Sequence, residues 1–364
     1  SNASDSQGRG SGGRRTRSSS PVKNADELLR LRKPVVWTNG PASRLFDQIW
    51  SAIQGEGYLP VELQPVLQSE LMVAGSRFGR QRHAALPSGR DKADLLALLP
   101  PLAAEDHDEV ARRVALHGEL REIRHLVDTT AQFINTPRSE AAWNDHIHGP
   151  LLRLAVAGVP AVVAENITQA SIAKPFVPAT AHGELEVSSI GGKTIDYALV
   201  LQPNQRLAAR IVDFVNGLDS GEPRTFNQST SPALCYRLTG VFIETKVDMR
   251  WRAEAKVQLG IWLASWFSRV ATFPSPPPRT GVAGTPRLPF LPVLLVVCES
   301  WELYFAFDRE ADFEVCGPLE IGGTKTVEGT YRLLQVLRLL AEWVAGEFCQ
   351  WVESCVLYQG DAAL

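Results

Sequence analysis

The chain has 364 residues, which is long enough for one large domain or two ordinary ones. Its 45% hydrophobic and 21% charged residues are typical of a soluble, globular protein. The longest apolar run, residues 288–298, contains Pro292 and is too short to cross a bilayer, so we expect no membrane segment. The polar, basic N-terminus also argues against a secretory signal.

The five cysteines are scattered and include no C-x-x-C pair. This pattern favours reduced thiols in an intracellular protein, nuclear or cytoplasmic, over a disulfide framework or a zinc site. The net charge is −3, and residues 1–23 carry five basic residues against one aspartate (+4), which leaves −7 on the remainder. Because nucleic-acid binders are usually basic overall, this balance argues against such a partner unless a local basic groove is present.

Residues 1–23 are rich in Ser, Gly and Arg, so we expect a disordered basic tail, whose first three residues look like a tag-cleavage scar. Residues 24–137 are expected to form a helical region packed on the core. The pattern predicts, in order, helices at 26–33, 43–54 and 60–73, a loop at 74–90, and a long amphipathic helix at 105–134.

A second helix, 140–156, carries Glu140, Asn144 and His148 on one stripe at four-residue spacing. His146 and His148 point about 200° apart on a helix, which makes them a poor metal pair. We interpret both histidines as surface or packing residues.

After residue 158 the pattern changes from helical to extended. The chain predicts strands at 161–164, 185–187, 194–201, 239–247, 292–300 and 301–307, and helices at 205–215, 253–271 and 326–347. A loop at 216–235 and a proline-rich excursion at 272–290 interrupt them. This order indicates an α/β core over residues 138–364, with a helical N-terminal annex.

The predicted strand at 239–247 carries two opposite charges in an apolar, β-branched run. Alternation places Phe242, Glu244 and Lys246 on one face and Thr245 on the other. A buried strand rarely carries a carboxylate and an ammonium group without a partner or a task. Asp196 lies in the preceding predicted strand, and two carboxylates from neighbouring strands can bind Mg²⁺, which prefers oxygen ligands. The lysine would project into the same space and could stabilise negative charge or orient water.

This pattern, Ile195-Asp196 followed by Glu244-Thr245-Lys246, resembles the PD-(D/E)XK nuclease superfamily. A helix precedes the first strand, and the helix after the second carries Gln258-Leu259-Gly260-Ile261-Trp262, which is similar to the Q-x-x-x-Y element of the exonuclease-like branch. With Trp143-Asn144 and the 301–305 stretch, residues 105–345 more narrowly resemble the fungal PD-(D/E)XK nuclease-like domain.

The resemblance implies a restriction-endonuclease-like mixed central sheet flanked by helices. It also implies that Asp196, Glu244 and the backbone carbonyl of Thr245 bind Mg²⁺ or Mn²⁺. Many relatives add an acid from the preceding helix, for which Glu140 is the nearest candidate and Asn144 the alternative. Lys246 would be the catalytic lysine, and Gln258 would support it or contact the nucleic-acid backbone.

Three departures from the family pattern leave these ligands in place. Ile195 replaces a proline, Trp262 replaces a tyrosine, and residues 202–238 must form an insertion. The competing interpretation is an exposed Glu-Lys pair on an edge strand, because E-x-K triplets are common. Two glycine-rich stretches, 191–194 and 322–325, lack the order of a phosphate-binding loop, and we interpret them as turns.

We therefore expect a metal-dependent nuclease that hydrolyses phosphodiester bonds in DNA, with RNA as the alternative substrate. A second hypothesis is a catalytically weak or inactive module that kept the fold and binds nucleic acid or a protein partner. A third is a toxin or effector that contacts a protein partner through residues 24–137.

Overall fold

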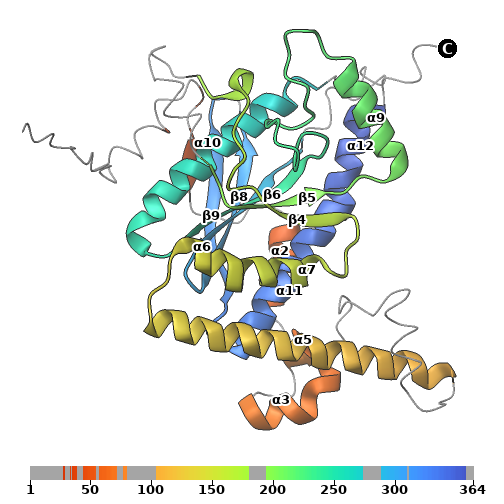
Figure 1. Ribbon diagram of the computed structural model, residues 1–364, viewed down its shortest axis with the longest axis vertical. Coiled ribbons are helices and arrows are strands. Elements are labelled where there is room, and N and C mark those ends of the chain that lie inside the picture. Colours follow the sequence, from red (N-terminus) through yellow and green to blue (C-terminus); the bar gives the residue numbers. More distant parts are fainter. Residues whose placement is uncertain are drawn as a thin grey trace, which may run out of the picture.

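The computed structural model describes residues 28, 33, 35–38, 44–54, 57–71, 77–79, 104–179, 194–273, 288–309 and 311–357. Within them, a seven-stranded sheet runs in the order β1-β9-β8-β7-β6-β5-β4 (Figure 1). Its strands are Val35–Thr38 (β1), Val162–Asn166 (β4), Tyr197–Leu201 (β5), Thr239–Lys246 (β6), Leu291–Val297 (β7), Ser300–Asp308 (β8) and Phe313–Gly323 (β9). The pairs β1–β9 and β6–β7 are parallel, and the other neighbours are antiparallel. A second, two-stranded sheet pairs Leu59–Pro60 (β2) with Phe78–Gly79 (β3).

The helices flank this sheet, so the predicted α/β class with a mixed central sheet is confirmed. They are Arg44–Gln54 (α2), Gln64–Leu71 (α3), Ala104–Asn135 (α5), Glu140–Trp143 (α6), Gly149–Val156 (α7), Gln205–Asn216 (α9), Arg252–Val270 (α10), Val327–Trp343 (α11) and Cys349–Leu357 (α12). π-Helical turns, Asn144–His148 and Val344–Phe348, join α6 to α7 and α11 to α12. No helix in the described part of the chain is long and apolar enough to cross a membrane.

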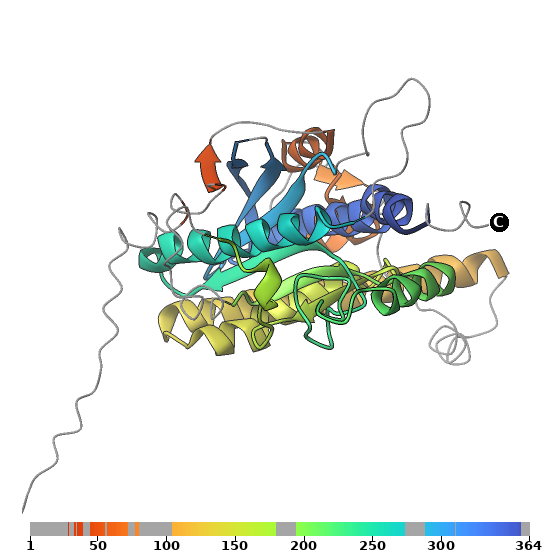
Figure 2. The same cartoon turned by 90° about the horizontal axis from the view of Figure 1, so that it is seen from above.

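Neighbouring residues of β8 show that helices cover both faces of the sheet. The ring of Tyr304 lies 5.3 Å from Lys256 Nζ of α10. The next residue, Phe305, lies on the opposite face, 6.1 Å from Phe46 of α2. Figures 1 and 2 show α5 beside the α6–α7 helix, on the flank away from α10.

Three adjacent inner strands, β5, β6 and β7, are buried over their whole length. Strands covered on both faces are usually continuous apolar runs. Glu244 and Lys246 of β6 depart from this rule, because both lie inside a buried strand. Their charges therefore need partners that the neighbouring elements supply.

The long helix α5 is attached to the core by polar contacts as well as by its apolar stripe. Arg338 of α11 forms an almost fully buried ion pair with Glu119 of α5. Near the C-terminal end of α5, the hydroxyl of Thr130 donates to that of Thr324 at 2.9 Å. The N-terminal region thus shares one continuous hydrophobic core with the sheet.

Two strands of the seven-stranded sheet were not predicted from the sequence. β9 contains Gly317 and Pro318, residue types that are depleted in strands, although it pairs with β8 along most of its length. β1 has only four residues, too few to show a period, and it makes the N-terminal region part of the main sheet rather than only a helical annex.

Smaller differences concern individual positions. Asp196 lies immediately before β5, not inside a strand. Part of the expected loop at 74–90 forms β3. The predicted tail (1–23) and the strand at 185–187 lie outside the described residues, as do nearly all of the helix at 26–33 and most of the excursion at 272–290.

Candidate active site

The predicted alternation of β6 is observed. The ring of Phe242 contacts that of Trp262 on α10, with centroids 5.9 Å apart. Glu244 and Lys246 alternate with Thr245 along the strand, so they lie on the same face as Phe242, and they are only 1% and 7% exposed. Thr245 faces the other side, where its hydroxyl lies 2.8 Å from Asn144 Oδ1 in the α6–α7 helix.

Asp196 is held by hydrogen bonds from two elements. The backbone N–H and the hydroxyl of Thr245 both lie 2.9 Å from Asp196 Oδ2. Asn144 Nδ2 donates to Asp196 Oδ1 at 3.2 Å. This carboxylate is therefore fixed between β6 and the helix, and at least one of its lone-pair positions remains free.

Asn144 takes part in this network because it opens a π-helical turn. Its carbonyl accepts the N–H of Gly149, five residues ahead, and the hydroxyl of Tyr197 at 2.8 Å. π-Helical turns are rare and frequently occur at functional sites. The turn brings the side chain of Asn144 to Asp196 while its backbone is bonded to β5.

His148 lies within hydrogen-bond distance of the Asn144 side chain and helps to hold it in place. It is fully buried, with Nδ1 2.9 Å from Asn144 Oδ1 and Nε2 2.8 Å from the carbonyl of Cys298. Burial lowers the pKa of His148 to about 4, against the opposing effect of the Cys298 carbonyl. At neutral pH the ring is thus neutral and carries one N–H, which it can donate to only one of these two oxygens.

Lys246 lies at the centre of a group of carboxylates. Its Nζ forms an ion pair with Glu244, lies 3.6 Å from Glu140 Oε2, and donates to the carbonyl of Thr245 at 3.0 Å. Glu140 comes from the first turn of α6, directly after the helix-capping Ser139. Helix α6 and strand β6 thus bring the predicted Glu140, Glu244 and Lys246 together.

The carboxylates outnumber the lysine, and their pKa values reflect this excess. Burial and the nearby Asp196 raise the pKa of Glu244 well above its ordinary value, although Lys246 opposes the shift. Burial also raises the pKa of Glu140. Burial alone would lower the pKa of Lys246, but the Glu244 and Glu140 carboxylates outweigh it and leave that pKa raised. The site therefore favours an additional positive charge.

Gln258 bonds the segment in front of Asp196 and not the lysine among the described residues. Its Nε2 donates to the carbonyl of Thr194 at 2.8 Å, and no bond to Lys246 is present. Because Thr194 lies two residues before Asp196, Gln258 fixes the segment that carries Asp196 and does not support the lysine directly. Trp262, one turn further along α10, packs in the core against Phe242.

A comparison with protein families matches residues 90–349 to the PD-(D/E)XK nuclease superfamily. The chain belongs to the PD-(D/E)XK nuclease superfamily. The matched range includes every residue of the site described above. Searches among curated proteins and among solved structures found no match.

Membership in this superfamily supports a nuclease-type hydrolase at the coarse level, and PD-(D/E)XK nucleases generally use divalent metals. The donor set here fits such an ion, because Glu244 Oε2 is buried without a hydrogen-bond partner and Asp196 is close enough to raise the pKa of Glu244. In the described ranges, however, no three His, Cys, Asp or Glu side chains converge as a ready-made metal site. A metal would therefore need backbone or water oxygens beside Asp196 and Glu244.

Asn144 was expected as the alternative metal ligand, and His148 was interpreted as a packing or surface residue. The hydrogen bonds that join His148 to Asn144 and Asn144 to Asp196 were not predicted. Tyr197, whose hydroxyl bonds the carbonyl of Asn144, was not singled out either. His146, in contrast, is exposed, as predicted.

Proposed function

We propose that this PD-(D/E)XK protein is a metal-dependent nuclease that hydrolyses phosphodiester bonds in DNA, with RNA as the alternative substrate. The main support is the meeting of Lys246 with the carboxylates of Glu244 and Glu140, beside a fixed Asp196. A purely structural ion pair would not need a third carboxylate or leave a buried oxygen of Glu244 without a partner.

Asp196 and Glu244 would hold Mg²⁺ or Mn²⁺, together with the Thr245 carbonyl, and Glu140 would complete the set directly or through water. When bound, the cation supplies a Lewis acid that neutralises charge on the phosphate and lowers the pKa of water. Thr245 and Asn144 would keep the Asp196 carboxylate in one orientation.

Lys246 would have two roles. In the metal-free protein its ammonium group compensates part of the negative charge, through Glu244 and Glu140. With substrate bound, the same ammonium group would contact a phosphate oxygen or orient the attacking water, because its raised pKa keeps it charged at neutral pH. Gln258 would hold the segment immediately before Asp196.

The test is cleavage of labelled single- and double-stranded DNA and of RNA, with Mg²⁺ or Mn²⁺ and with EDTA. We expect metal-dependent products from the parent and none from Lys246→Met or Asp196→Asn. Circular dichroism of each variant separates lost chemistry from lost folding. If the parent cuts none of these substrates, or if Lys246→Met cuts as well as the parent, the proposed function is wrong.

A second candidate is a PD-(D/E)XK module that binds nucleic acid or a protein partner without turnover. Its support is the lack of a preformed metal cluster in the described residues and the lysine bound to both Glu244 and the Thr245 carbonyl. Calorimetric titration with Mn²⁺ discriminates the two. Binding that Asp196→Asn abolishes favours the nuclease, and no binding by the parent favours the module.

A further inference from the structure

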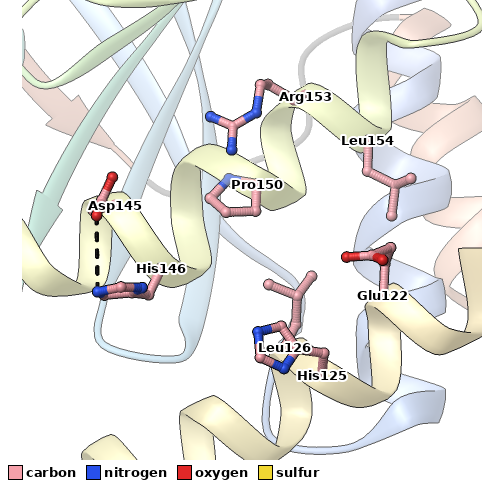
Figure 3. A pocket seen from close by; sticks show the side chains of 8 residues that line it. All are labelled: Glu122, His125, Leu126, Asp145, His146, Pro150, Arg153 and Leu154. Atoms are coloured by element: carbon pink, nitrogen blue, oxygen red, sulfur yellow. Dashed lines mark ion pairs between the residues drawn. The ribbon is translucent and has the colours of Figure 1, made fainter.

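Two adjoining hollows lie along the α6–α7 helix beside the candidate site. One, of about 250 Å³, lies between this helix and the β4–β5 edge of the sheet. The other, of about 490 Å³, lies between the same helix and α5 (Figure 3). Asp145 and Arg153 line both hollows, so these two side chains mark the junction.

The smaller hollow reaches the site itself. Asn144 and Tyr197 line it. Asn144 donates to Asp196, and Tyr197 directly follows Asp196 in the chain. Exposed Asn166, at the end of β4, and half-buried Thr168, just beyond it, add polar groups opposite the helix. The hollow therefore borders the network that holds the Asp196 carboxylate.

Arg153 provides an unused positive charge at the junction. Its side chain is exposed, and it makes no ion pair with any carboxylate in the described part of the chain. Gly149 leaves room for it, because a Cβ atom there would lie 3.0 Å from the Tyr197 hydroxyl and 3.4 Å from Arg153 Nη1. The exposed carboxylate of Asp145 lies 3.7 Å from His146 Nε2 instead, as the dashed line in Figure 3 shows.

A guanidinium group in a hollow beside the proposed phosphodiesterase site is suited to bind a phosphate group. Its planar donor fork binds two oxygens of a phosphate at once. Phosphate contacts of this kind fix the register of a strand without reading its sequence. On the basis of the proposed function, we propose that the two hollows bind the sugar–phosphate backbone of the substrate on one side of the cut, with Arg153 on a phosphate next to the scissile one.

Removing the charge of Arg153 and removing that of Asp145 should change the affinity for the nucleic acid in opposite directions. Arg153→Gln removes the contact and should weaken binding about tenfold, with a reduction of about one in the slope of log affinity against log salt. Asp145→Asn removes a repulsive charge and should strengthen binding. Arg206→Gln, an exposed arginine on α9 away from both hollows, is the matched control and should change neither quantity.

Fluorescence anisotropy measures this with the full chain, a labelled oligonucleotide and Mn²⁺, and every protein compared carries Lys246→Met so that the probe is not cut. The inference is supported if Arg153→Gln binds the oligonucleotide more weakly and with less salt dependence, while Arg206→Gln binds it as the parent does. If the parent binds and cuts while Arg153→Gln binds equally well, the inference is wrong and the nuclease proposal stands. If the parent neither binds nor cuts, both fail. A mononucleotide that displaces the probe as well as an unlabelled strand does would overturn the assignment to a strand.

Discussion

Thr245 is the side chain through which β6 positions Asp196, and Thr245→Val removes only its hydroxyl. The hydroxyl lies 2.9 Å from Asp196 Oδ2 and 2.8 Å from Asn144 Oδ1. It carries a single hydrogen, so it can donate to only one of the two at a time. Valine keeps the shape of the side chain, and the Thr245 N–H bond to Asp196 is not affected.

The expected effects follow from these contacts. A lost hydrogen bond to a charged acceptor costs about 1.5–3 kcal/mol, and the remaining bonds to Asp196 place the net cost near the lower end, about 1–2 kcal/mol. For a domain of this size that lowers Tm by about 1–4 °C. Side chains that orient metal ligands change activity or metal affinity by about 10- to 100-fold, so we expect a comparable loss in kcat/KM for cleavage.

Thr130→Val is the matched control, because Thr130 is equally buried and its hydroxyl bonds Thr324 at 2.9 Å, outside the site. The assay compares Tm by calorimetry and kcat/KM on one DNA substrate for the parent and both variants. We expect both variants to lose stability but only Thr245→Val to lose most of its activity. Parental activity in Thr245→Val, or an equal loss in Thr130→Val, would refute a positioning role for Thr245.

Three further predictions concern the charges of the site. Mn²⁺ at a hundred times its Kd should add about 2.7 kcal/mol to the free energy of unfolding of the parent, but not to that of Asp196→Asn. Thermal unfolding with and without Mn²⁺ measures this difference. An equal gain in both proteins contradicts Asp196 as a metal ligand. The raised pKa of Glu244 means that the metal-free parent loses stability as pH rises through that pKa, so the Tm of Glu244→Gln in EDTA should rise relative to that of the parent as pH increases. The pKa of about 4 for His148 lies below the unfolded value, so its contribution of about 3 kcal/mol is present above pH 6.5 and is lost as pH falls to about 4. In urea unfolding, His148→Gln should therefore lose less stability than the parent over this range, whereas the exposed His125→Gln should behave as the parent does.

The sequence predicted the elements whose residues have a strong local signature. The amphipathic helices α5, α10 and α11 and the apolar strands β6 and β7 were found because burial imposes a period on their side chains. The Glu244–Lys246 pair was found for the opposite reason, since it breaks the apolar pattern of a buried strand. β9 has neither signature, because Gly317 and Pro318 interrupt it, and only its pairing with β8 makes it a strand.

The support around the site could not be predicted in the same way. Nothing in the residues of 144–148 indicates a π-helical turn, although that turn directs Asn144 to Asp196 and its carbonyl to Tyr197. Arg153 was one of many arginines in the sequence. Its place at the junction of two hollows depends on how the α6–α7 helix meets the β4–β5 edge and α5, and such tertiary contacts leave no local period.

The charge of the chain, which argued against a nucleic-acid partner, is consistent with the proposed site once its parts are considered separately. The carboxylates of Glu140, Asp196 and Glu244 exceed the single ammonium group of Lys246, so the metal-free site would repel a phosphate. A divalent cation would neutralise that excess, and Arg153 adds a positive charge beyond it along the hollows. Affinity for a nucleic acid then depends on the bound metal and on a few local cations, and the net charge of the whole chain has little influence on it.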